Sequence, residues 1–193
     1  SSATAIRKAL EEKKDVSSLV PDFVLEKFSE LHFKEDYFKF LKYKIMLDDN
    51  LERYQTVDEG LGFKLKKEIV SSTSYEELIE KIKSKRYTQN RINRMLNHIL
   101  CNFTKEKKSK CQNLEYIRIL GFNDKGQAFI NRNKKECDLP IISNFSKNKS
   151  VMMEQEFIAT LVYASILDEK RKKELIEKEY KYHPKYKEKM NNE

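Results

Sequence analysis

Apolar residues recur every three or four positions along most of the chain, and this spacing predicts a mainly α protein. Only four glycines and three prolines occur in 193 residues, so few positions would interrupt a helix. Helices are predicted near residues 4–14, from Pro21 onward, and at 35–47, 63–70, 78–82 and 88–103. The apolar residues of 35–47 are Tyr37, Phe38, Phe40, Leu41, Ile45 and Met46. They cover a wide face, so we expect this helix to be central.

Short signals mark the predicted helix boundaries. Gly60 and Gly62 interrupt one segment and indicate tight packing or a backbone that faces a ligand. Ser74 followed by Glu77 has the spacing of a capping box. Thr88 is expected to cap the next helix, whose core stripe comprises Ile92, Met95, Leu96, Ile99, Leu100 and Phe103.

The periodicity changes after a polar stretch, 104–113, which we interpret as a loop. Residues 114–122 are predicted to form a strand, 124–134 a short helix capped by Asp124, and 139–143 a second strand. The fold class is therefore mainly α, a multi-helix domain with a small strand–helix–strand unit near residues 114–143. Its two strands should lie parallel, with a right-handed connection.

The rest of the chain is again helical in pattern. Residues 151–167 predict an apolar-faced helix that docks against the core, and an exposed helix from Asp168 gives way near Pro184 to a basic end. We expect residues 1–193 to form a single domain. It would comprise a helical core at 1–103, the α/β unit at 114–143, and a C-terminal helix with a basic tail at 150–193.

Composition adds a charge signal and excludes several classes of protein. The formal net charge of +8 and pI near 9.2 favour a polyanionic partner. No apolar run is long enough to span a membrane and the first residues lack a signal-peptide core, so a cytoplasmic location and no membrane partner are expected. Cys101, Cys111 and Cys137 lack metal-site spacing and are interpreted as reduced thiols.

The strongest indication of RNA binding lies between residues 81 and 94, a window without any acidic residue. The candidate RNA-binding residues are Lys83, Lys85, Arg86, Tyr87, Arg91 and Arg94. Arginines one turn apart near a helix start can each grip a phosphate, and Tyr87 could stack on an unpaired base. The alternative is a solvated basic face, or pairing within the chain to Glu76, Glu77 and Glu80.

The first residues suggest a second anion site. Ser2 or Thr4 can cap a helix whose free N–H groups face a phosphate, and Arg7 adds charge one turn further on. The candidate nucleotide-binding residues are Ser2, Thr4, Ile6 and Arg7. The alternative is that these residues form only an ordinary N-cap followed by a solvated helical turn, which would have the same sequence pattern.

A resemblance to a known family extends over nearly the whole chain. Residues 2–7 are similar to the second signature of HIGH-type nucleotidyltransferases, Ile-Ser-Ser-Thr-x-Ile-Arg. The order of segments resembles the C-terminal region of bacterial tRNA(Met) cytidine acetate ligases. The similar stretches are Ser2 to Leu10, Lys85 to Thr88 with Arg91 and Ile92, Tyr116 to Phe122, and Leu139 to Ile142.

The resemblance implies a function in tRNA modification. Such an enzyme activates acetate with ATP as acetyl-adenylate and then acetylates the wobble cytidine of elongator tRNA(Met). We expect magnesium to accompany the ATP. The expected partners are tRNA and the family's N-terminal nucleotidyltransferase domain, whose HxGH-like motif these residues lack. We therefore expect no bound cofactor and no catalysis by this chain alone, and no catalytic residue is assigned within it. The alternative is an interaction or oligomerisation domain of another nucleotidyltransferase, without an RNA role.

Overall fold

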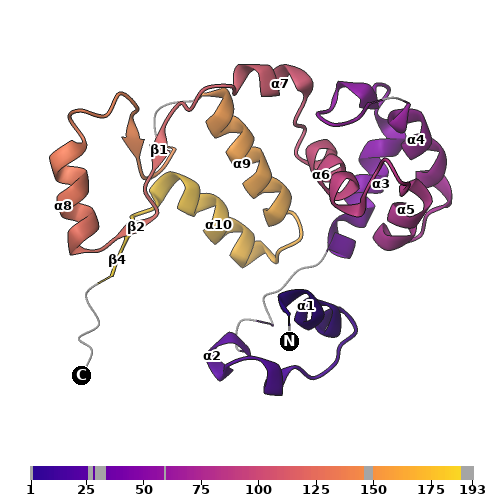
Figure 1. Cartoon of the computed structure of the whole chain (residues 1–193), viewed down its shortest axis with the longest axis horizontal. Helices are drawn as coiled ribbons and strands as arrows, with labels where there is room; N and C mark the ends of the chain where they lie inside the picture. Colours follow the sequence, from indigo (N-terminus) through magenta and orange to yellow (C-terminus); the bar gives the residue numbers. More distant parts are fainter. Residues whose placement is uncertain (1, 26–27, 29–33, 59, 146–149, 188–193) are drawn as a thin grey trace.

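A computed structural model describes residues 2–25, 28, 34–58, 60–145 and 150–187 of the chain. The predicted mainly α class is confirmed, because the strands are short pairs among many helices. Helices α3 to α6 cluster at one end of an elongated molecule, α8 and the strands lie at the other, and α9 and α10 lie between them (Figure 1).

The helical core is built by a 3-10 turn at Lys34–Tyr37 and by α3 (Phe38–Leu47), α4 (Leu61–Ser71), α5 (Tyr75–Ile82) and α6 (Gln89–Leu100). A further 3-10 turn, Leu51–Arg53, joins α3 to α4. The central place predicted for 35–47 is confirmed, since α3 packs against both α4 and α6.

The wide apolar face predicted for that helix is partly wrong. Phe38, Leu41 and Ile45 are buried, whereas Phe40 is 48% and Met46 49% exposed. Because α4 and α6 cover only one stripe of α3, the flanking apolar positions face outward. On α6 the predicted stripe is confirmed at Ile92, Met95, Leu96 and Ile99, all buried.

The N-terminal segment carries α1 (Ala3–Glu11), a 3-10 turn (Ser17–Leu19) and α2 (Asp22–Leu25). Helix α1 ends earlier than the predicted 4–14, and Lys13 adopts a left-handed conformation with φ 56°. The helix predicted after Pro21 begins at Asp22, and part of the stretch after Leu25 lies outside the described residues.

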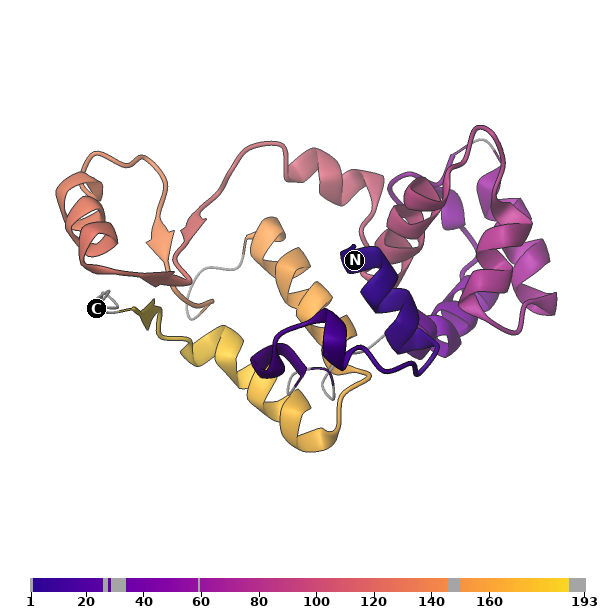
Figure 2. The ribbon, with the colours of Figure 1, turned by 60° about the horizontal axis from the view of Figure 1, so that its bottom comes forward.

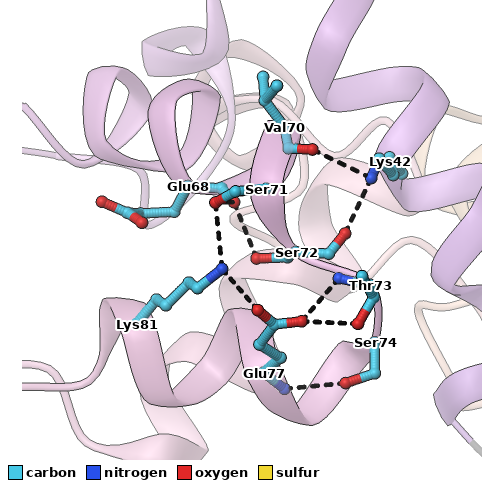
Figure 3. Close-up of polar contacts among 9 residues, drawn as sticks. All are labelled: Lys42, Glu68, Val70, Ser71, Ser72, Thr73, Ser74, Glu77 and Lys81. Atoms are coloured by element: carbon cyan, nitrogen blue, oxygen red, sulfur yellow. Dashed lines mark hydrogen bonds and ion pairs between the residues drawn. The ribbon is translucent and has the colours of Figure 1, made fainter.

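Two of the predicted boundary signals are confirmed, and Figure 3 shows one of them. Ser74 Oγ accepts a hydrogen bond from the Glu77 N–H (3.1 Å), so Ser74 caps α5. Gly60 is the N-cap of α4 with φ 75°, whereas Gly62 lies inside that helix, so the predicted interruption is confirmed only at Gly60. Gly62 is buried, and a Cβ there would meet the carboxylate end of the Glu52 side chain. Thr88 occupies the N-cap position of α6 but its side chain makes no capping hydrogen bond, so that part of the prediction is wrong.

The polar stretch 104–113 is not a loop. It contains α7 (Lys105–Lys110), which leads away from the helical core (Figure 1). Thr104 Oγ1 accepts from the Lys107 N–H (3.1 Å) and caps this helix. Helix α7 has no apolar face, because most of its side chains are exposed. The hydrophobic periodicity therefore did not predict this helix.

The strand–helix–strand unit is confirmed in its parallel pairing and wrong in its details. Strand β1 (Ile117–Arg118) pairs in parallel with β3 (Ile141–Ile142). The single strand predicted at 114–122 is divided, because β2 (Gly121–Phe122) pairs instead with β4 (Lys185–Tyr186) from the C-terminal segment. Helix α8 (Asp124–Asn133) is capped by Asn123, which accepts from the Gly126 N–H (2.9 Å), and not by Asp124.

Helices α9 (Val151–Ala164) and α10 (Glu169–Lys181) form an antiparallel pair in the middle of the molecule (Figure 2). The expected docking of 151–167 on the core needs correction, since α9 packs mainly on α10. Its link to the core includes Gln155, which donates to the Cys101 carbonyl (2.7 Å) and accepts from Lys107 Nζ (3.1 Å).

A partly buried ion-pair network holds this middle region together. Arg118 of β1 donates to Glu156 of α9 (2.6 Å) and to Glu179 of α10 (2.5 Å). Its guanidinium also lies 4.4 Å from the centre of the Phe145 ring. One side chain thus joins the strand unit to both helices.

Candidate nucleic-acid interface

The window predicted to bind RNA connects α5 to α6. Lys83 is the C-cap of α5, Lys85 and Arg86 lie in the connecting loop, and Arg91 and Arg94 follow in the first turns of α6. The structure brings Arg86 and Arg91 together at one aromatic ring, that of Tyr87. The carbon of the Arg91 guanidinium lies 4.8 Å from the ring centre and that of Arg86 lies 6.0 Å from it.

Tyr87 is half-buried and packs against the hydrophobic core. Its ring is therefore held in place from below while two guanidinium groups contact it, an arrangement typical of cation–π stacking. Arginines stacked in this way lose side-chain freedom before any ligand arrives. A base that stacked on Tyr87, as the sequence suggested, would compete with them for the ring.

Two lysines of the window form ion pairs within the chain. Lys81 donates to Glu77 (2.6 Å) and to Ser71 Oγ (3.1 Å), as Figure 3 shows. The Lys81 ammonium, with the N–H and hydroxyl of Thr73, lowers the pKa of Glu77 to about 2. Lys83 pairs with Glu80 (3.2 Å). For these two positions the alternative of pairing within the chain is confirmed.

The remaining cations form what we call the basic cluster: Lys85, Arg86, Arg91 and Arg94. Lys85 and Arg94 are exposed, and neither has a hydrogen-bonding or ionic partner among the residues that the structure describes. The first turn of α6 contains no acidic residue, so its N–H groups add positive potential beside the cluster. This local field favours an anion with several negative oxygens.

His98, one turn beyond Arg94, is not part of this surface. Its Nδ1 lies 2.9 Å from the Gln55 carbonyl and 3.1 Å from Thr56 Oγ1, so the ring serves the packing of a turn. Sequence reasoning missed Asn97, which shares the exposed face of α6 with Arg94. The i, i+3 spacing of the two residues was the signal available.

The predicted nucleotide-binding residues lie on α1. Ser2 is its N-cap and accepts from the Ala5 N–H (3.2 Å), which agrees with the capping role considered above. Thr4 and Arg7 are exposed, whereas Ile6 is half-buried. The first turn carries no acidic residue. Helix α1 thus presents uncompensated N–H groups and the charge of Arg7 to solvent, features suited to a phosphate.

A cavity with acidic side chains lies between α1 and the helical core. The far end of α1 faces the beginning of α5 across this cavity of about 240 Å³. Its lining is mainly acidic and comprises Glu11, Lys34, Glu35, Asp36, Tyr75 and Glu76. These acidic side chains interrupt any continuous cationic surface between α1 and the helical core on this side of the molecule.

The described parts of the chain contain neither a metal site nor a membrane-spanning helix. No three His, Cys, Asp or Glu side chains there are arranged to hold a metal ion. No helix there is both long and apolar enough to cross a bilayer. Cys101, Cys111 and Cys137 are free thiols.

Comparison with known proteins defines the class. The model of the HIGH Nucleotidyl Transferase family matches residues 1–179, and the chain belongs to this family. Among its relatives, tRNA(Met) cytidine acetate ligase of Bacillus mycoides is 35% identical over 199 residues, covering 95% of the chain and 51% of the relative. The Geobacillus sp. protein of that name is 35% identical, covering 93% of the chain and 48% of the relative. The chain therefore spans about half the length of these relatives.

Solved structures agree. Thermotoga maritima TmcAL in its apo form matches with a TM-score of 0.77 at 26% identity, covering 98% of this chain and 51% of that one. The same enzyme bound with alpha-thio ATP matches with a TM-score of 0.79 at 27% identity, covering 98% and 52%. The resemblance seen in the sequence is confirmed.

Proposed function

We propose that this chain is the tRNA-binding part of an ATP-dependent ligase that acetylates the wobble cytidine of elongator tRNA(Met). The observation that carries the RNA role is the basic cluster, in which Arg86 and Arg91 stack on Tyr87 beside an acid-free helix start. Arginines held beside an aromatic ring are suited to gripping phosphate oxygens in pairs. The names of the relatives supply the nature of the RNA.

The start of α1 would complete the nucleotide site of such an enzyme. In our proposal the free N–H groups behind Ser2 and the guanidinium of Arg7 contact the phosphates of ATP, which magnesium accompanies. The proposed partner is an N-terminal nucleotidyltransferase domain, for which the relatives have room, since the chain covers 51% of the Bacillus mycoides protein. Support comes from the exposure of Thr4 and Arg7 and from the alpha-thio ATP in the Thermotoga maritima structure.

The chemistry would then be divided between two parts. The nucleotidyltransferase domain would form acetyl-adenylate from acetate and ATP. The described residues would hold the tRNA and stabilise the phosphates. We propose that the chain alone neither forms the adenylate nor turns over, and that it works in the cytoplasm, where its tRNA would be met.

The competing function is an interaction domain without an RNA role. It predicts that neutralising the basic cluster changes nothing in RNA binding. The test is a titration of fluorescein-labelled elongator tRNA(Met) with the chain at several salt concentrations. Our proposal requires steep weakening with salt, and a shallower dependence once Arg94 is replaced with Gln.

A further inference from the structure

A cavity of about 290 Å³ lies between the helical core and α9. The core side is lined by Lys34, Tyr37, Tyr75, Asn97, Leu100 and Cys101, and α9 contributes Ala159, Val162 and Tyr163. Its volume is at the lower limit of the ~300–1,000 Å³ of small-molecule pockets, so it suits one flat group better than a whole nucleotide. Lys34 and Asn97 are exposed, and they form its rim toward solvent.

The aromatic lining is electrically neutral. Burial raises the pKa of Tyr37 to about 12, and burial also raises the pKa of Tyr75. The Tyr75 hydroxyl donates to Asn93 Oδ1 (2.9 Å), so Tyr75 offers the cavity its ring and not its hydroxyl. Neutral rings at the bottom of a cavity favour a neutral heteroaromatic plane over a phosphate.

The rim carries the means to recognise the edge of such a plane. The Asn97 side chain has no hydrogen-bond partner among the described residues. An amide offers a donor and an acceptor side by side, which is the pattern that nucleobase edges display. Lys34 adds a cation whose Nζ lies 5.7 Å from the centre of the Tyr75 ring.

The cavity is also next to the proposed RNA surface. Arg94 and Asn97 are three residues apart on α6, a rise of about 4.5 Å, and both are exposed. Asn90, Arg94, Asn97 and Cys101 follow one another along the same face of the helix, and the last two line the cavity. A nucleotide whose phosphate contacts Arg94 can therefore direct its base at the rim.

We propose that this cavity receives one unpaired nucleobase of the RNA that the basic cluster holds. The base lies against the tyrosine rings, with its edge on Asn97. The inference rests on the proposed RNA role and deepens it, because the cavity distinguishes RNA with unpaired bases from a duplex, which the basic cluster alone does not.

The test compares two RNAs in binding titrations: a labelled stem–loop with an unpaired loop, and a fully paired duplex with the same number of phosphates. Asn97→Ala and Tyr163→Leu should each weaken binding of the stem–loop about tenfold, the effect of losing one base contact. Binding of the duplex should not change. The loss should be equal at every salt concentration, because no ionic contact is removed.

Asn90→Ala is the matched control, since Asn90 lies on the same face of α6 but outside the cavity lining. Asn97 is exposed and alanine favours helix, so Asn97→Ala should fold normally. If Arg94→Gln reduces the salt dependence while Asn97→Ala and Tyr163→Leu alter neither affinity, the base site is wrong and the RNA role stands. If none of the three variants has an effect, both proposals fail.

Discussion

The guanidinium carbon of Arg91 lies 4.8 Å from the centre of the Tyr87 ring, and this contact ties the first turn of α6 to the loop after α5. Arg86 approaches the same ring at 6.0 Å. One partly buried aromatic side chain therefore sets the position of two cations on the surface.

Replacing Tyr87 with Leu should weaken tRNA binding about threefold to tenfold, because two arginines lose the ring that orders them. Tyr87→Phe keeps the ring and should bind almost as well as the wild type. Equilibrium titration with elongator tRNA(Met) measures both. Equal losses in the two variants would mean that the hydroxyl, and not arginine stacking, matters.

Glu77 should stabilise the folded protein at neutral pH and lose this effect at low pH. Its pKa is lowered to about 2 in the folded protein by Lys81 and Thr73, below its ordinary value of 4.5. The contribution is therefore fully present above pH 4.5 and is lost as the pH falls toward 2. Urea unfolding should show Glu77→Gln less stable than the wild type at pH 6, with the gap closing between pH 4.5 and 2.

Glu80→Gln serves as the comparison for Glu77, because Glu80 pairs with Lys83 on the exposed side of the same helix. Its replacement should cost little at any pH, as surface ion pairs usually do. A gap for Glu77→Gln that stays constant down to pH 2 would contradict the assigned hydrogen bonds.

Glu179→Gln should destabilise the middle of the molecule by about 2–3 kcal/mol. Breaking a buried pair typically costs ~3–5 kcal/mol, and Arg118 here keeps its second partner, Glu156. Glu174→Gln, an exposed position on α10, should have almost no effect. Chemical unfolding followed by circular dichroism compares the two. Equal stability of both variants would show that the network contributes nothing.

Arg7→Gln should impair ATP use without loss of stability, because Arg7 is exposed on α1. In an enzyme that includes the nucleotidyltransferase domain, losing one charge-assisted hydrogen bond of ~1.5–3 kcal/mol should raise KM for ATP roughly tenfold to a hundredfold. Lys8→Gln, its exposed neighbour, should leave KM unchanged. A lower melting temperature with unchanged ATP kinetics would make Arg7 a structural residue.

Much of the fold could be predicted because a helix with one strongly apolar stripe shows a period of three to four residues in the sequence. Ile92, Met95 and Ile99 on α6 are such a case, and all three are buried. Helix α7 could not be found in this way, since Lys105 to Lys110 bury no apolar face. The pairing of β2 with β4 joins residues about sixty positions apart, and nothing in two-residue strands encodes that partnership.

For the candidate site, the sequence predicted the types of residue but not their partners or their arrangement in space. An acid-free window located the basic residues, but the window begins just after acidic residues of the same helix. Lys81 and Lys83 pair with Glu77 and Glu80, four and three positions earlier, and the sequence could not decide between this pairing and RNA binding. The cavity could not be predicted from the sequence, because Tyr37, Asn97 and Tyr163 come together only where α9 lies beside α6.

The most direct test of the central claim is the salt dependence of elongator tRNA(Met) binding by the wild type, Arg91→Gln and Arg94→Gln, with Arg132→Gln on α8 as the control at the far end of the molecule. We predict that log affinity falls linearly with log salt, and that each of the first two replacements reduces the slope by about one unit or slightly less. Arg132→Gln should keep the wild-type slope. Identical affinities and slopes for all four proteins would contradict an RNA role for the basic cluster.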